Sequence, residues 1–132
     1  MGSSVLKAYL ELSKIKEREE KQPVKIIASY SIISDHLPSS IQKMEYHNFS
    51  GEIVLQVTPS LFWDLISLIR EEKKYGVTDN GTIYKKGLLG KKILIAETNM
   101  REAYSSNQPL TLTLHSEEVC KLIDKLVNEK KY

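Results

Sequence analysis

The chain has little of several residue types that often mark a function. Its 132 residues include one cysteine, one tryptophan, two phenylalanines and four prolines. The single Cys120 excludes an internal disulfide and favours a reducing compartment. Because 19 basic residues stand against 17 acidic ones, the formal charge of +2 excludes a strong field over the whole surface of the kind that attracts nucleic acid or membranes.

Long hydrophobic runs are also missing. No apolar stretch approaches the roughly 20 residues that a membrane-spanning helix requires, and the N-terminus lacks the apolar core of a signal peptide. We therefore predict a cytoplasmic protein with no membrane partner. Hydrophobic residues at 41% and charged residues at 27% are close to the globular average, which predicts one folded domain over residues 1–132. Within it we expect an N-terminal amphipathic helix over 1–21, which packs on the domain or on a second copy, and a core over 22–132.

Two segments of the chain follow the same plan. Residues 53–74 and residues 110–131 each begin as a short strand, turn, and continue as an amphipathic helix that ends in Glu-Lys-Lys or a close equivalent. In the first segment, Thr58 suits the N-cap and Pro59 the first helical position. In the second, the turn falls at Ser116. The pattern predicts a duplicated strand-turn-helix unit.

The remaining segments complete the predicted fold. A polar loop or a short helical turn is expected over 99–108. Branched residues and turn signals predict further strands over 24–31, 41–46, 82–86 and 92–98, the last two forming a hairpin. Since strands and helices do not alternate strictly, we predict an α+β fold in which helices cover a small mixed β-sheet of five or six strands.

Motifs for metal binding and catalysis are missing from the sequence. His36, His47 and His115 are far apart along the chain, and no cysteine or close carboxylate completes a metal set. We predict no metal, no cofactor and no catalytic residue. His115 lies at a junction between strand and helix, where a structural role is favoured and a role as a base is the alternative.

The hairpin carries a cluster of basic residues. Lys85, Lys86, Lys91 and Lys92 flank the turn Gly87-Leu-Leu-Gly90. Lysines there either attract phosphate or mark a solvated edge that resists aggregation. Seven tyrosines add stacking faces, although the aromatic motifs of ribonucleoprotein domains are absent. A nucleic-acid-binding accessory protein that uses these four lysines is therefore one alternative.

A second cluster of polar residues follows the strand at 92–98. Asn99, Arg101 and Glu102 bring an amide, a guanidinium and a carboxylate to the end of that strand. Strand ends that face a cleft are common binding positions. A loop that only satisfies its own turn explains these residues equally well.

Residues 28–32, Thr58-Pro59 and residues 98–102 are three segments that, taken in order, resemble segments of the viral ring nucleases, anti-CRISPR proteins of archaeal viruses and phages that degrade cyclic oligoadenylate. Residues 28–32, Ala-Ser-Tyr-Ser-Ile, resemble a segment after the family's first strand. Thr58-Pro59 occupies the place of a Gly-His pair before the central helix. Residues 98–102, Thr-Asn-Met-Arg-Glu, are similar to a later motif. The resemblance implies that Ser31 contacts ligand and that Arg101 and Glu102 match the family's Arg and Glu.

The same resemblance departs from the family at its catalytic position. Pro59 stands where the family has its histidine, and a proline side chain neither donates nor accepts a proton. The resemblance therefore implies a non-enzymatic viral anti-defence protein, in the host cytoplasm, that sequesters a cyclic nucleotide or ADP-ribose-type immune signal. It also implies a homo-oligomer, for which the N-terminal helix is a spare amphipathic surface. The expected ligand-binding residues are Ser31, Thr58, Asn99, Arg101 and Glu102.

Other interpretations stay open beside this one. The nucleic-acid-binding protein differs in its salt dependence, because phosphate contacts weaken steeply with salt. An enzyme would need His115 or Glu102 in place of the missing base. A fourth interpretation is a protein–protein inhibitor of a host factor, and no residue pattern distinguishes it from the sequestering protein.

Overall fold

The structure, a computed structural model, describes residues 5–21, 29–32 and 37–130. Seven strands, four α-helices and one short 3-10 turn lie within these ranges. In chain order the elements are α1 (Val5–Glu20), β1 (Ser29–Ile32), β2 (Ile41–His47), β3 (Glu52–Val57), α2 (Pro59–Glu71), β4 (Tyr75–Val77), β5 (Thr82–Lys86), η2 (Leu88–Gly90), β6 (Lys92–Thr98), α3 (Met100–Ser106), β7 (Leu110–Leu114) and α4 (Glu117–Lys130).

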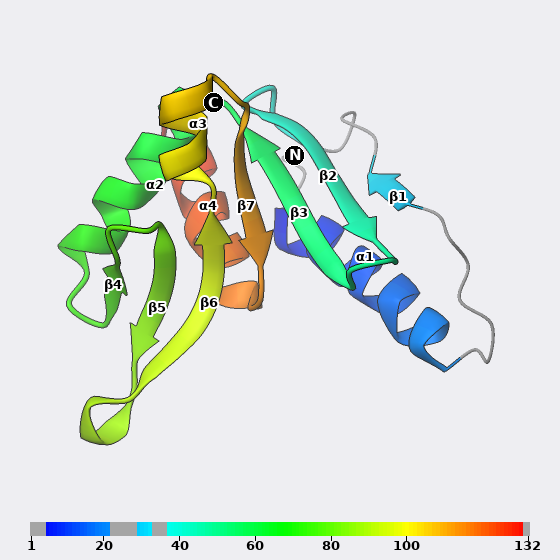
Figure 1. Cartoon of the computed structure of the whole chain (residues 1–132), viewed down its shortest axis with the longest axis horizontal. Helices are drawn as coiled ribbons and strands as arrows, with labels where there is room; N and C mark the ends of the chain where they lie inside the picture. The colour runs from blue at the N-terminus through cyan, green and yellow to red at the C-terminus, as the bar shows by residue number, and fades with distance from the viewer. Residues whose placement is uncertain (1–4, 22–28, 33–36, 131–132) are drawn as a thin grey trace.

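The described strands form one sheet in the order β1-β2-β3-β7-β6-β5-β4, and every neighbouring pair is antiparallel (Figure 1). The α+β class is confirmed, and the expected mixed sheet is wrong. β3 and β7 run antiparallel because the chain between them returns through three further strands instead of a single crossover helix.

The strand count and one helix end also differ from the prediction. The expected five or six strands did not include β4, which begins directly after Lys74, the residue to which we extended the helix. α2 ends at Glu71, and the three-residue β4, with Gly76 at its centre, is too short to show an alternating pattern. In chain order β3 is followed by α2 and β7 by α4, while the duplication of a strand-turn-helix unit stays a prediction.

Side chains alternate between the two faces of the sheet, as a two-residue period requires. One cross-strand row is buried under the helices, and the row beside it faces the other way. The buried row contains Tyr46, Ile53, Leu114, Ala96 and Ile83. The opposite row contains Glu45, Val54, Thr113, Glu97 and Thr82. We call these the covered face and the open face.

Helices α1, α2 and α4 lie on the covered side (Figure 1). α1 packs on α4 through its buried Val5, Ala8 and Leu12, so its apolar stripe is covered within the chain. The Asp124 carboxylate of α4 accepts hydrogen bonds from the first helical amides of α1, at 2.7 Å from Val5 N and 3.1 Å from Leu6 N.

The start of α2 agrees with its sequence signals. Thr58 is the extended N-cap, its hydroxyl accepts from Leu61 N at 3.5 Å, and Pro59 is the first helical residue. The helix buries a stripe that includes Phe62, whereas the neighbouring Trp63 is exposed. This separation of two adjacent aromatic residues positions the site described next.

Candidate functional site

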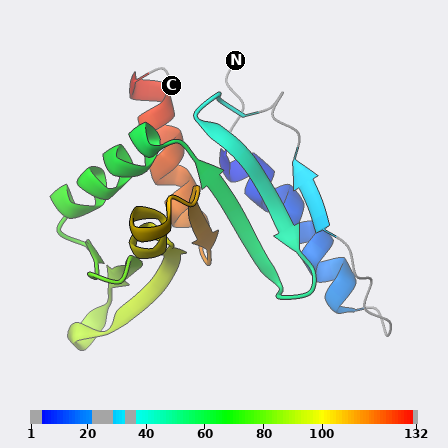
Figure 2. The same cartoon turned by 45° about the horizontal axis from the view of Figure 1, so that its top comes forward.

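A cleft of about 580 Å³ opens where the start of α2, helix α3 and the beginning of β7 meet. Figures 1 and 2 show α3 beside the ends of β6 and β7, close to α2. Trp63 and Tyr104, which are 44% and 89% exposed, come from α2 and α3 and line this cleft. Its described lining consists of Gln42, Gln56, Val57, Pro59, Trp63, Met100, Ala103, Tyr104, Asn107, Gln108, Pro109 and Leu110.

Trp63 is available to a ligand because of its place on α2. The buried stripe of this helix leaves Trp63 on the flank, where its ring meets the Phe62 ring edge-on at a centroid distance of 5.0 Å. Phe62 is fully buried, so it provides a fixed support. An anchored indole is a rigid stacking surface whose ordering costs little side-chain entropy on binding.

Asn99 fixes the start of α3 against the start of β7, two segments that line the cleft. Its side-chain amide donates to the Pro109 carbonyl at 2.7 Å, and its oxygen accepts from Thr111 N at 2.8 Å. These two bonds join the start of α3 to the start of β7. At the other end of α3, Asn107 adopts a left-handed backbone with φ of 55°, which suits asparagine better than most residues. Asn99 therefore supports these two segments without lining the cleft itself, and its side-chain amide is already engaged.

The chemistry of the cleft is neutral. None of the described side chains that line it carries a charge. The floor includes a pair of amides, in which Gln56 Nε2 donates to Gln42 Oε1 at 2.7 Å. Glutamine and asparagine side chains donate and accept in one plane, which matches the edge of a planar heterocycle or a peptide group. The cleft is therefore suited to a flat, uncharged group.

A second, polar hollow of about 350 Å³ lies on the open face next to the cleft. Two carboxylates, Glu97 and Glu102, line it together with threonine and asparagine side chains. His115 Nε2 lies 3.3 Å from Glu97 Oε2, and Arg101 Nη1 donates to Asn80 Oδ1 at 3.4 Å. Because two acidic groups line this hollow, it is a poor place for a phosphate.

The structure divides the five expected ligand-binding residues among three places. Asn99 and Glu102 line the polar hollow, with Arg101 beside them. Thr58 caps α2, where its hydroxyl accepts from Leu61 N. Ser31 lies on β1, three strands from β7 in the sheet, and donates to Glu45 Oε2 at 3.2 Å. These residues do not form one pocket.

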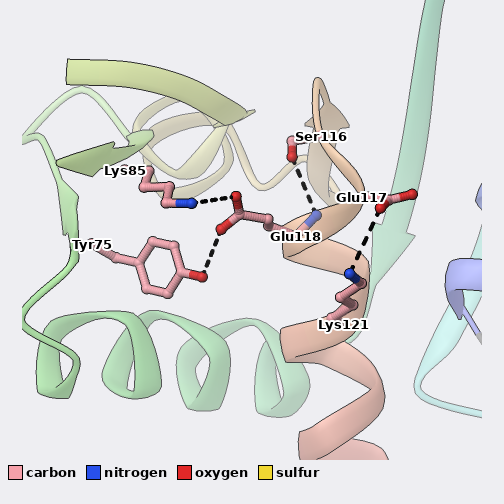
Figure 3. A network of polar contacts seen from close by, with 6 residues as sticks. All are labelled: Tyr75, Lys85, Ser116, Glu117, Glu118 and Lys121. Carbon is pink, nitrogen blue, oxygen red and sulfur yellow. Dashed lines mark hydrogen bonds and ion pairs between the residues drawn. The ribbon is translucent and has the colours of Figure 1, made fainter. Parts of the chain in front are cut away.

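The four hairpin lysines also separate. Lys85 turns to the covered side, where its ammonium lies 2.8 Å from Glu118 Oε1 (Figure 3). Lys92 Nζ lies 4.8 Å from the centroid of the Tyr84 ring. Lys86 and Lys91 are exposed. The four lysines therefore do not form one continuous row that could bind phosphates.

Lys85 belongs to a network between β5, β4 and the start of α4 (Figure 3). The second oxygen of Glu118 accepts from the Tyr75 hydroxyl at 2.8 Å, and Ser116 Oγ accepts from Glu118 N at 3.2 Å. The hydrogen bond from Lys85 lowers the pKa of Glu118, against an opposing effect of burial. Burial, assisted by Glu118, raises the pKa of Tyr75 to about 12. The network holds α4 on the sheet.

The described residues can be searched for metal-binding groups, for a reactive thiol and for a membrane-spanning helix. Within residues 5–21, 29–32 and 37–130, no three His, Cys, Asp or Glu side chains form a group suited to a metal ion. Cys120 is buried in α4, and burial raises the pKa of its thiol. In the same ranges no helix has the length and apolar character needed to cross a membrane.

Comparison of the chain with protein-family models, curated proteins and solved structures finds no match. The residues of the cleft are therefore assigned from geometry. Sequence reasoning did not identify Gln42, Gln56, Trp63 or Tyr104 as site residues. One signal was present in the sequence: Phe62 already completes the apolar stripe of this helix, which leaves the large Trp63 side chain on its flank.

Proposed function

We propose that this protein is a non-enzymatic binding protein whose cleft between α2 and α3 holds the base of a small nucleotide-type signal. The observation that carries the proposal is the pairing of two exposed aromatic side chains, Trp63 and Tyr104, with an uncharged, amide-rich lining. Stacking on aromatic side chains contributes about 1–3 kcal/mol per base, and amides bond to the edges of bases. A volume of about 580 Å³ is within the range of small-molecule sites.

Binding without cleavage is supported by the side chains of the cleft. Pro59 lines it at the position where the resemblance to viral ring nucleases has a histidine. The described lining side chains include no histidine, aspartate, glutamate, lysine or cysteine, the residues that most often act as general acids or bases. The role that follows is sequestration, and a viral protein that withholds a cyclic nucleotide or ADP-ribose-type immune signal is the form we propose.

The phosphates of such a ligand are expected to lie outside the polar hollow. Glu97 and Glu102 line that hollow, and they oppose a second negative charge. We therefore expect most of the binding free energy to come from the base and little from the phosphates. The apolar stripe of α1 that suggested a homo-oligomer is covered by α4 and is not exposed for a second copy. A homo-oligomer therefore stays a prediction.

Intrinsic fluorescence tests the proposal directly, because Trp63 is the only tryptophan in the chain. The protein is titrated with adenosine, adenosine monophosphate, cyclic dinucleotides, cyclic oligoadenylates and cyclic ADP-ribose isomers. We expect at least one ligand to quench Trp63, and Tyr104→Ala to weaken that ligand by about 5- to 150-fold. The matched control is Phe49→Ala, which removes an exposed aromatic ring from the β2–β3 turn and leaves affinity unchanged.

Two results contradict the proposal. If none of these ligands changes the fluorescence or raises the melting temperature, the base-binding function is wrong. If chromatography of the ligand released by heating recovers a cleaved product, the protein is an enzyme, and His115→Ala and Glu102→Gln then identify the base.

A further inference from the structure

The tip of the β5–β6 hairpin is the most exposed apolar part of the described chain. Leu88 and Leu89 are 88% and 98% exposed, and Ile93 and Leu94 are 52% and 41% exposed. We call these four residues the hairpin tip, in which Ile93 and Leu94, as consecutive residues of β6, point to opposite faces of the hairpin. In both views the hairpin projects away from the body of the molecule (Figures 1 and 2). Grouped apolar exposure of this kind marks an interaction site more often than scattered single residues do.

The backbone of the turn holds the leucines outward. Leu89 has φ of 58° and ψ of 34°, a left-handed conformation that is more favourable for glycine or asparagine than for leucine. Two backbone hydrogen bonds close the turn, from Gly87 N to Lys91 O at 2.7 Å and from Lys91 N to Leu88 O at 3.2 Å. Turns normally carry polar residues or glycine, so a strained leucine here is a feature that folding alone does not explain.

The charge around the hairpin tip has one sign. The stretch from Gly81 to Ala96 contains four lysines and no acidic residue. Lys85 is engaged by Glu118, whereas Lys86, Lys91 and Lys92 are exposed on both sides of the tip. A convex group of aliphatic side chains is thus flanked by three cations.

The geometry points to an anionic lipid surface as the partner of the hairpin tip, with Leu88 and Leu89 entering the headgroup boundary and the lysines meeting lipid phosphates. A protein partner would need a concave apolar pocket with an acidic rim matched to this shape. A bilayer accepts a convex aliphatic tip without a preformed pocket, and flanking lysines keep their charges at its surface. This surface contact departs from the expectation of no membrane partner, and it does not depend on the proposed ligand.

Cosedimentation of the full chain with vesicles tests the inference. Phosphatidylcholine vesicles with and without phosphatidylserine are compared at low and high salt. We expect binding to the anionic vesicles that weakens with salt, because surface lysines act through a screened potential. Leu89→Gly keeps the left-handed turn at lower strain and is expected to weaken binding about tenfold. Lys91→Gln is expected to weaken it about fivefold.

Leu10→Ala is the matched control, since it shortens a partly exposed leucine on α1 and is expected to leave vesicle binding unchanged. The inference is overturned if anionic vesicles do not bind the protein, if Leu89→Gly binds as well as the native chain, or if neutral vesicles bind equally at any salt. Self-association that Leu89→Gly abolishes, without vesicle binding, would identify a second copy as the occupant and also overturn it.

Discussion

The two faces of the sheet are built from the same strands, but they differ in burial. On the covered face, Leu55 and Leu112 lie in register and are fully buried. One residue along the same strands, Val54 and Thr113 lie in register on the open face. Because side chains alternate within a strand, one face of the sheet packs in the core and stabilises the fold. The other face stays available for a binding site.

The covered side and the open side also differ in which elements their polar side-chain contacts connect. On the covered side, Asp124 joins α4 to the start of α1, and Glu118 joins α4 to two strands. On the open side, the contact of Gln56 with Gln42 joins neighbouring strands that backbone bonds already hold, while Asn99 joins α3 to β7. Contacts that connect separate elements should therefore contribute more to stability.

The largest expected difference is between adjacent residues of β3. Leu55→Ala should reduce the free energy of unfolding by about 2–5 kcal/mol, because it leaves a cavity in a packed core. Val54→Ala, one residue away on the open face, should reduce it by less than about 1 kcal/mol. Urea unfolding of both variants measures the two values. Equal losses would mean that the open face is covered in solution.

A smaller difference is expected between polar contacts. Asp124→Ala removes the carboxylate that caps α1 and should cost about 1–2 kcal/mol. Gln42→Ala removes one exposed contact on the open side and should cost about 0.5 kcal/mol or less. Thermal unfolding followed by circular dichroism measures the stability and the helix content of both variants. If Asp124→Ala has the smaller effect, the α1–α4 contact does not hold the helix layer together.

The Glu118 network adds a dependence on pH. Because the pKa of Glu118 in the folded protein is held below its ordinary value of 4.5, its stabilisation is present above pH 4.5 and is lost as the pH falls through the folded value. Glu118→Gln should therefore lose about 1 kcal/mol at pH 7 and progressively less below pH 4.5. Denaturant unfolding of both proteins over this pH range is the measurement.

A matched variant and a contrary result accompany that experiment. Glu102→Gln, on the open side, should change stability at pH 7 by less than about 0.5 kcal/mol. A gap between native protein and Glu118→Gln that stays constant into acid would show that the Glu118 charge does not contribute to the contact with Lys85.

The smallest effect is expected at Cys120, which tests access to the covered side. A thiol reagent should leave the folded protein unlabelled, because Cys120 is buried and burial raises the pKa of its thiol. Thr113→Cys, on the open face, should react within the same period while Cys120 does not. Rapid labelling of Cys120 in the native chain would show that α4 opens readily from the sheet.

Local signals explain which elements sequence reasoning predicted well. The hairpin strands at 82–86 and 92–98 and the strand at 110–114 agree with the structure, because turn residues and branched residues act over a few positions. β4 was missed because a three-residue strand has no periodic pattern and exists through its pairing with β5. The antiparallel order of β3 and β7 depends on how the chain between them returns, which no local pattern encodes.

The sequence by itself determined the α+β class, the start of α2 at Thr58 and Pro59, and the burial of one stripe on each of α1, α2 and α4. These depend on capping, backbone restriction and periodicity, which act between near neighbours. Only the tertiary structure decided that Trp63 and Tyr104 line one cleft and that Ser31 lies far from Asn99. Residues distant along the chain meet only after strand order and register are set, and that order is chosen by burial over the whole sheet.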